Sequence, residues 1–154
     1  MKILIAYYSR TGVTKNTAEI ISEKIDCDIE EIKDTKNRSG IINYIKSGKD
    51  AMTSTLTKIK SIENDPSQYD LMIIASPVWA GTMASPILTY LTENKDKFKN
   101  VSFISTCKST CEKALEDMVK ITEKEPIATM FVDKNDVGHK LENKIELFVQ
   151  KINN

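Results

Sequence analysis

Four short segments of the chain are apolar at both odd and even positions, which is the pattern of strands buried on both faces of a sheet. They are Lys2–Tyr8, Leu71–Ser76, Val101–Ser105 and Ile127–Val132. A fifth extended segment, Asp28–Ile32, is more polar and is typical of a strand at the edge of a sheet. The pattern therefore predicts five strands, of which the second in the chain lies at an edge.

Amphipathic segments separate the predicted strands. Their apolar residues recur with helical spacing: Ala18, Ile21 and Ile25; Ala84, Ile87, Leu88 and Leu91; Ala114, Leu115, Met118 and Val119; and Val137, Leu141, Ile145, Phe148 and Ile152. A further short helix is predicted over Ile41–Lys46, with Ser39 as its N-cap and Gly48 at its end.

Strict alternation of strands and helices predicts an α/β fold, in which helices cover both faces of a five-stranded parallel sheet. Right-handed crossovers leave few topologies, and a polar second strand fits the strand order 2-1-3-4-5. We find no repeat and no linker-like segment, so the whole chain, residues 1–154, is expected to form one domain.

Composition narrows the class of protein. The 154 residues include 22 basic and 22 acidic side chains, and this balance argues against a nucleic-acid partner. The apolar runs are too short to cross a membrane, and no signal peptide is recognisable after Met1. Three cysteines, an odd number, favour a reducing compartment, so we expect a cytoplasmic location.

Three polar loops follow the three inner strands of the predicted order. They are "SRTGVT" from Ser9, "SPVWAGTMASP" from Ser76 and "TCKSTC" from Thr106. The carboxyl ends of parallel strands meet at one edge of the sheet, which is where open α/β sheets bind ligands. We therefore expect these loops to lie side by side around one site.

The first loop has two interpretations. Gly12, the start of a helix near Thr14 and the nearby hydroxyl groups suit a phosphate. The same residues also suit an ordinary turn with a helix cap. The loop lacks both the nucleotide motif GxxxxGK[ST] and the dinucleotide motif GxGxxG.

Trp79, the one tryptophan of the chain, adds to the case for a ligand. A large aromatic side chain here either packs into the core or stacks on a flat ligand, and beside a phosphate loop we favour the planar, phosphorylated ligand. Cys107 and Cys111 are expected to be buried small side chains and not metal ligands, because Cys27 is remote in sequence and His139 is the one histidine of the chain. His139 is expected to face solvent.

No acid–base pair or nucleophile–base set falls in these loops, so no catalytic residue and no metal ligand is predicted. Chemistry at this site would therefore come from a cofactor.

The motifs resemble those of the flavodoxin family. "SRTGVT" is similar to the flavodoxin phosphate loop, [ST]-x-T-G-x-T, and "QYDLMIIASPVW" resembles the third strand and the flavin-ring loop that follows it. The resemblance implies a flavodoxin-like fold and FMN as cofactor. It implies three sets of cofactor-binding residues: Ser9, Arg10, Thr11, Gly12, Val13 and Thr14 at the phosphate; Pro77, Val78, Trp79, Ala80 and Gly81 at the ring, with Trp79 stacked on it; and Thr106, Cys107, Lys108 and Ser109 at the pyrimidine edge.

The chain departs from the family pattern in charge. Flavodoxins are usually acidic, but this chain is neutral, and Lys15 stands where an acidic residue is common. With Arg10 and Lys108, Lys15 is expected to form a basic rim that stabilises the negatively charged reduced flavin and makes its potential less negative. The segment Arg38–Leu56 lacks the aromatic residue that often covers the second face of the ring, so either Met52 covers this face or it is open.

Three functions follow from these patterns. The first is an electron carrier that uses FMN to shuttle electrons between redox partner proteins. The second is an FMN-dependent reductase that uses NAD(P)H to reduce quinones, flavins or another small acceptor. The third is a binding or regulatory module that holds a phosphorylated ligand without flavin.

Overall fold

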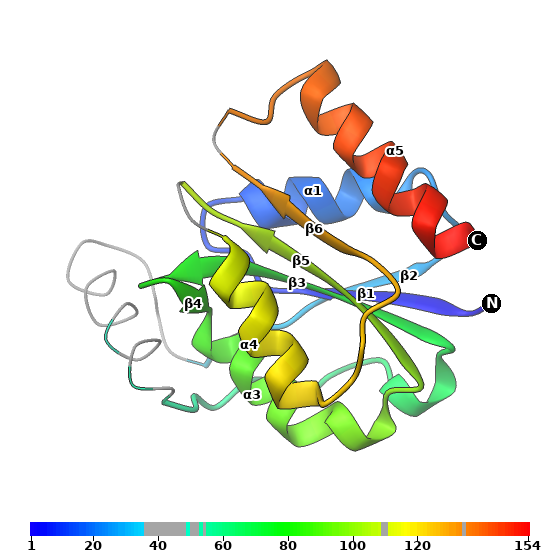
Figure 1. Ribbon diagram of the computed structural model, residues 1–154. Helices are drawn as coiled ribbons and strands as arrows, with labels where there is room; N and C mark the ends of the chain where they lie inside the picture. The colour runs from blue at the N-terminus through cyan, green and yellow to red at the C-terminus, as the bar shows by residue number, and fades with distance from the viewer. Residues whose placement is uncertain (36–48, 50–52, 54, 109–110, 134) are drawn as a thin grey trace.

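The computed structural model describes residues 1–35, 49, 53, 55–108, 111–133 and 135–154 (Figure 1). Its strands are β1 (Ile3–Tyr7), β2 (Asp28–Glu31), β3 (Leu71–Trp79), β4 (Thr82–Met83), β5 (Asn100–Thr106) and β6 (Thr129–Val132). Its α-helices are α1 (Val13–Ser22), α3 (Ser85–Asn94), α4 (Glu112–Thr122) and α5 (His139–Asn153), with short 3₁₀ helices at Pro66–Gln68 and Lys95–Lys97. The predicted helix at Ile41–Lys46 lies outside the described residues.

The sheet confirms the predicted strand order. Its strands run β2-β1-β3-β5-β6, all pairs in this path are parallel, and β5 and β6 are the fourth and fifth strands that the sequence predicted. In register, Ile5 of β1 stands opposite Ile29 of β2 and Ile73 of β3. The polar β2 forms an edge, as its composition indicated.

The third strand is longer than the sequence predicted. It continues from Ser76 to Trp79 because its end pairs in antiparallel fashion with the two residues of β4. Ala80 and Gly81 join the two strands, and both have positive φ, 48° and 86°. This is the backbone geometry that a two-residue hairpin needs to follow the twist of its strands.

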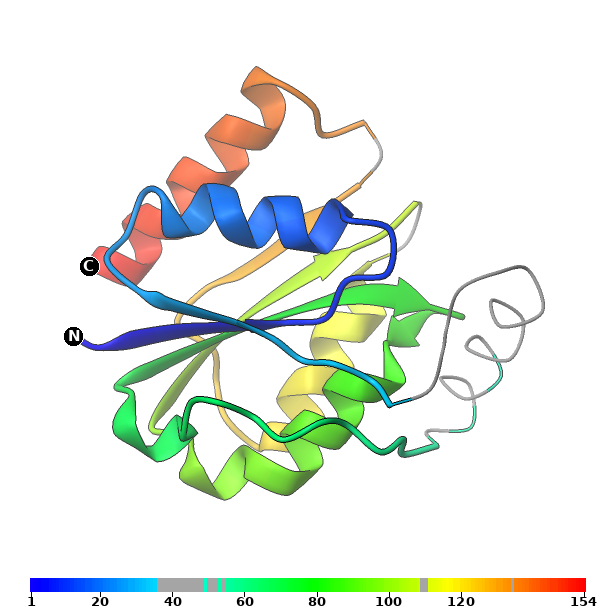
Figure 2. The ribbon, with the colours of Figure 1, turned by 180° about the vertical axis from the view of Figure 1, so that it is seen from behind.

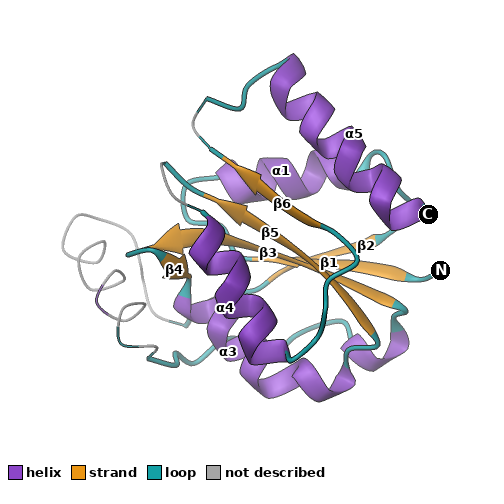
Figure 3. Cartoon of the chain, in the orientation of Figure 1, coloured by secondary structure: helices purple, strands orange, loops and turns teal. Residues whose placement is uncertain are grey.

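Side-chain alternation along the strands separates two hydrophobic layers. Ile3, Ile5 and Ile73 pack with α1 and α5 on one face, while Leu4 and Ile74 pack with α3 and α4 on the other. Figure 2 shows α1 and α5 together on one side of the sheet, with α3 and α4 on the opposite side. Figure 3 shows the same three layers coloured by secondary structure.

The last helix begins later than its apolar spacing suggested. Val137, predicted on its buried stripe, precedes α5 and is 70% exposed, so that prediction is wrong for this residue. Gly138 has φ 54°, and the helix starts only after it. Ile145, Phe148 and Ile152 are buried as predicted.

None of the helices in the described part of the chain has the length and apolar character needed to cross a membrane. The side chain of His139 at the start of α5 is almost completely exposed, as predicted.

Candidate functional site

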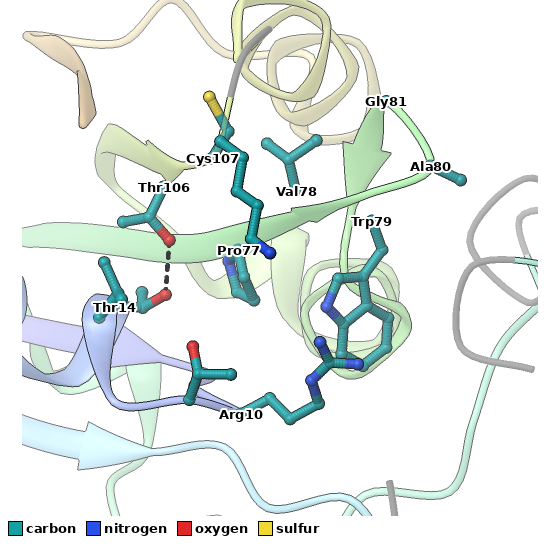
Figure 4. A pocket seen from close by; sticks show the side chains of 12 residues that line it. Arg10, Thr14, Pro77, Val78, Trp79, Ala80, Gly81, Thr106 and Cys107 are labelled. Atoms are coloured by element: carbon teal, nitrogen blue, oxygen red, sulfur yellow. Dashed lines mark hydrogen bonds between the residues drawn. The ribbon is translucent and has the colours of Figure 1, made fainter. Parts of the chain in front are cut away.

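A pocket of about 450 Å³ lies at the carboxyl ends of β1, β3 and β5 (Figure 4). Its volume is within the range of small-molecule sites. The residues that line it come from the three predicted loops: Arg10, Thr11, Val13, Thr14, Pro77, Val78, Trp79, Ala80, Gly81, Thr106, Cys107 and Lys108. All of them were predicted from the sequence as site residues, and the fold brings them together.

Ser9 and Gly12 shape the first loop without lining the pocket. Gly12 has φ 91° at the N-cap of α1, and its N–H donates a hydrogen bond to Ser9 Oγ at 3.1 Å. The carbonyl oxygen of Gly12 accepts the first backbone hydrogen bond of the helix, from Asn16 N–H at 2.9 Å. The turn at Gly12 is thus held by hydrogen bonds within the loop and the first turn of the helix. Ser109, which was also predicted as a site residue, lies outside the described residues.

The first turn of α1 has no side-chain cap. No side chain caps its backbone N–H groups, and these groups carry the positive end of the helix dipole. Val13 and Thr14, the first two residues of this helix, both line the pocket. This arrangement is suited to an anion such as a phosphate group, and it favours that interpretation over a simple capped turn.

A hydrogen bond between two hydroxyl groups joins the first and third loops. Thr14 Oγ1 and Thr106 Oγ1 are 2.7 Å apart, both side chains are buried, and Figure 4 draws this bond at one side of the pocket. Only one of the two hydroxyl hydrogens is used in the bond. The second hydroxyl can therefore donate to a ligand without any rearrangement of the loops.

Trp79 packs in the core and also lines the pocket. The residue is only 6% exposed and packs in the core edge-on against Tyr8, with ring centroids 5.4 Å apart, yet it also lines the pocket. The guanidinium group of Arg10 lies over the indole, 5.8 Å from its centre (Figure 4). A flat ligand that stacked on this face of the ring would displace Arg10.

The charge at the pocket is positive. Arg10 and Lys108 line it, and none of the described residues that line it carries a carboxylate. Lys15 does not line it; its Nζ lies 3.7 Å from Glu19 Oε1, and both side chains are half exposed. Lys15 is therefore outside the described lining of the pocket, and its place in a basic rim around the flavin stays a prediction.

The sequence of residues 2–149 matches the family model for flavodoxins. The chain belongs to the flavodoxin family. No curated protein matches the sequence. Among solved structures, a flavoprotein from Lactobacillus acidophilus NCFM, crystallised in complex with FMN, is 29% identical and has a TM-score of 0.73 over 93% of this chain and 97% of that chain.

Two further flavodoxins share the fold. The Streptococcus pneumoniae TIGR4 flavodoxin is 16% identical, with a TM-score of 0.65 over 99% of this chain and 98% of that chain. Oxidised Flavodoxin 1 from Bacillus cereus is 13% identical, with a TM-score of 0.57 over the same shares of the two chains. At these identities the likeness concerns the architecture alone.

The third loop of this flavodoxin-family chain holds a disulfide bond that the sequence did not predict. Cys107 and Cys111 are joined, with their Cα atoms 5.7 Å apart. The expectation that both cysteines are buried holds for Cys111 but is wrong for Cys107, which is half-buried and lines the pocket. Cys27 is a free thiol, and its burial, with Asp28 and Asp26 nearby, raises its pKa to about 11. Within the described residues no group of three possible ligands could hold a metal ion.

Two hydrogen bonds that hold the elements beside the pocket in place were not predicted from the sequence. Ser76 Oγ accepts a hydrogen bond from Ala84 N–H at 3.0 Å, which fixes the start of α3 against the end of β3. Thr82 in β4 donates to the carboxylate of Asp117 in α4, which also pairs with Lys113. Burial alone would raise the pKa of Asp117, but the bonds from Lys113 and Thr82 lower it below its usual value. No local signal marks either contact, because the partners come from different elements.

Proposed function

We propose that the chain is an FMN-binding flavoprotein that carries electrons between redox partner proteins. The observation that carries this proposal is the pocket itself. It combines an uncapped helix N-terminus, a tryptophan beside an open cavity and two cations, without a carboxylate or a histidine among its lining residues. Such a site can bind and orient a cofactor but offers no general base of its own.

The pocket residues divide between the two ends of FMN. The N–H groups of the first turn of α1, with the hydroxyls of Thr14 and Thr106, would hold the phosphate. The Pro77–Gly81 segment would hold the isoalloxazine ring, with Trp79 against one face after Arg10 has moved aside. Cys107 and Lys108 would border its pyrimidine edge.

FMN supplies the redox chemistry, since the bound flavin accepts and releases one or two electrons. The task of the chain is to bind it, to exclude water from one ring face with Trp79 and to set the local charge. Arg10 and Lys108 place positive charge at the pocket, which favours the negatively charged reduced form of a flavin. The family and the FMN complex of the Lactobacillus acidophilus relative support this proposal.

The second candidate is an FMN-dependent reductase that takes hydride from NADH or NADPH. The observation that favours it is the pair of cations at the pocket, Arg10 and Lys108, which would attract the phosphates of a nicotinamide dinucleotide. In this case the electrons would reach a small acceptor rather than a partner protein.

Binding of FMN is tested by adding FMN to apoprotein and recording tryptophan fluorescence. Trp79 is the sole tryptophan, so the emission reports on the pocket directly. We expect strong quenching that saturates at one FMN per chain. Unchanged emission, together with protein that purifies without yellow colour, would reject both flavin functions and favour a module that binds another phosphorylated ligand.

Anaerobic stopped-flow mixing of the FMN-loaded protein with NADH and with NADPH separates the two flavin functions. A carrier should keep its flavin absorbance for minutes in the absence of a reductase protein. Rapid bleaching by either nucleotide would contradict the carrier function and support the reductase.

A further inference from the structure

The proposed electron-carrier function makes no use of the disulfide bond beside the pocket. Cys107 lies at the end of the pocket next to Thr106, and its sulfur points away from the indole of Trp79 (Figure 4). The residue is half-buried, whereas Cys111 is 1% exposed and stands at the N-cap of α4. The bond thus joins a partly exposed cysteine to a buried one.

The bond stabilises the fold less than a disulfide that closes a longer loop would. It joins residues only four positions apart, and the stabilisation from a cross-link grows with the length of the loop that it closes. Other contacts hold both cysteines in place: Cys107 N–H donates to the Val132 carbonyl at 2.9 Å, and the buried Ser105 hydroxyl donates to the Cys111 carbonyl at 3.1 Å. The two sulfurs would therefore stay close to each other after the bond opened.

The surroundings of Cys111 suit a leaving thiol. The N-terminus of α4 stabilises a departing thiolate, although the carboxylate of Glu112, which accepts the Cys111 N–H at 3.1 Å, offsets part of this effect. The sulfur of Cys111 lies 3.9 Å from the Val132 carbonyl oxygen. Once protonated, the Cys111 thiol has this acceptor within reach.

We propose that Cys107–Cys111 is a redox-active disulfide that exchanges with external thiols and forms a second two-electron centre beside the pocket. An external thiolate attacks the sulfur of Cys107, the bond between the two sulfurs breaks, and Cys111 leaves as a thiolate that takes a proton from water. A second external thiol attacks the resulting mixed disulfide, which releases Cys107 as a thiol. Two external thiols are oxidised to one disulfide while the protein disulfide is reduced to two thiols.

This proposal does not depend on FMN, so it is tested on the protein without cofactor. A Cys27→Ser background removes the third thiol. The folded protein is equilibrated in buffers that span a wide range of reduced to oxidised glutathione, and free thiols are then trapped with a maleimide and counted by intact mass. We expect the population with two trapped thiols to rise from none to all and to fall again when the ratio is reversed.

Circular dichroism on the same samples must show the native fold throughout this titration. A disulfide that stays closed in the most reducing buffer until the protein unfolds would overturn the proposal. So would a dithiol that does not close again in the oxidising buffer.

The direction of attack is tested with two further variants in the same background. Cys111→Ser leaves only the partly exposed thiol of Cys107, and Cys107→Ser leaves only the buried thiol of Cys111. With an aromatic disulfide as reagent, we expect Cys107 to react at least tenfold faster, since the mixed disulfide has to form there. Equal rates, or a faster reaction at Cys111, in variants whose unfolding curves confirm the native fold, would contradict attack at Cys107.

Discussion

Two loops at the same edge of the sheet use their polar groups in opposite ways. The loop after β6 contains Asp136, whose carboxylate is buried and pairs with Lys140 at 2.8 Å and with Lys144, while it also accepts the N–H of Asp133. The loop after β1 leads into a helix without a side-chain cap, beside a cavity. The loop after β6 supplies partners for its own buried carboxylate, whereas the loop after β1 leads into a helix N-terminus that can donate to a ligand.

The polar groups of the loop after β6 stabilise the fold, whereas those of the loop after β1 are placed to bind a ligand. Burial would raise the pKa of Asp136, but the two lysines and the Asp133 N–H lower it from 3.8 to about 2. A pKa lowered by folding means that the ionised carboxylate stabilises the fold, fully above pH 4, and that this contribution disappears as the pH falls toward 2. The loop after β1 has no comparable buried ion pair among its described residues, and the helix that follows it has no side-chain cap at its N-terminus.

The largest effect is expected from Asp136→Asn. The variant should lose about 2 kcal/mol of unfolding free energy at pH 7, because the lowered pKa corresponds to roughly 1.4 kcal/mol per unit. Urea unfolding measures this loss, and Asp96→Asn, at an exposed carboxylate, is the matched control with little change. The affinity for FMN should stay within about twofold of the unchanged protein. Weaker FMN binding at full stability would contradict the separation of the two loops.

The pH dependence of stability tests the same cluster. Between pH 5 and pH 2 the unchanged protein should lose about 2 kcal/mol more than Asp136→Asn, because only the carboxylate can be protonated there. Parallel curves for the two proteins over this range would show that the Asp136 ion pairs do not stabilise the fold.

On the binding side, Thr14→Val should weaken FMN binding about tenfold, or roughly 1.4 kcal/mol, because it removes one of the two pocket hydroxyls that we propose bind the phosphate. Thr17→Val is the matched control, since Thr17 is buried in the same helix but donates to the Val13 carbonyl instead of lining the pocket. Titration of apoprotein with FMN measures both affinities. Equal losses in the two variants would mean that general damage to α1, and not the pocket hydroxyl, weakens binding.

A smaller effect, about 1 kcal/mol or less, is expected at the hairpin turn. Ala80 has φ 48°, a left-handed backbone conformation that is strained for a residue with a Cβ atom but not for glycine. Ala80→Gly should therefore stabilise the fold by about 0.5 kcal/mol. Gly81→Ala should destabilise it by about 1 kcal/mol through backbone strain alone, since no atom lies within 4 Å of the added methyl group. Thermal unfolding measures both changes, and shifts of the same sign would contradict the turn geometry.

The smallest effect concerns the charge of the pocket. Lys108→Gln should make the flavin potential more negative by roughly 20 mV, which corresponds to about 0.5 kcal/mol for one electron at a partly screened site. Lys15→Gln is the control and should change nothing, because Lys15 pairs with Glu19 outside the pocket. A redox titration at low and at high salt measures the potential. A larger shift of the potential for Lys15→Gln than for Lys108→Gln would show that Lys15 acts on the flavin from outside the described pocket lining.

Much of this architecture could be predicted from local patterns. Segments that are apolar at both odd and even positions predicted the parallel strands. The rule that open α/β sheets bind ligands at the carboxyl ends of their strands then predicted which loops line the pocket. The extension of β3 to Trp79 could not be predicted, because Pro77 and Gly81 are typical of a loop, and the segment is a strand only through pairing of Pro77 with β5 and of Val78 and Trp79 with β4.

The remaining differences between Thr14 and Lys15, and the pairing of the two cysteines, depend on three-dimensional placement. Thr14 and Lys15 are neighbours in the sequence, but a helix turns by about 100° per residue, so one is buried at the pocket and the other faces solvent. The pairing of Cys107 with Cys111 depends on how the chain between β5 and α4 bends, which the spacing of two cysteines does not specify.

We propose that FMN binds at the loops after β1, β3 and β5 and not at the loop after β6. Backbone amide NMR spectra of labelled apoprotein, recorded during addition of FMN, locate the binding site residue by residue. We predict saturating shifts at residues 9–14, 77–81 and 106–108, while residues 135–140 keep their positions. Shifts that centre on residues 135–140, or no saturating shifts at all, would contradict it.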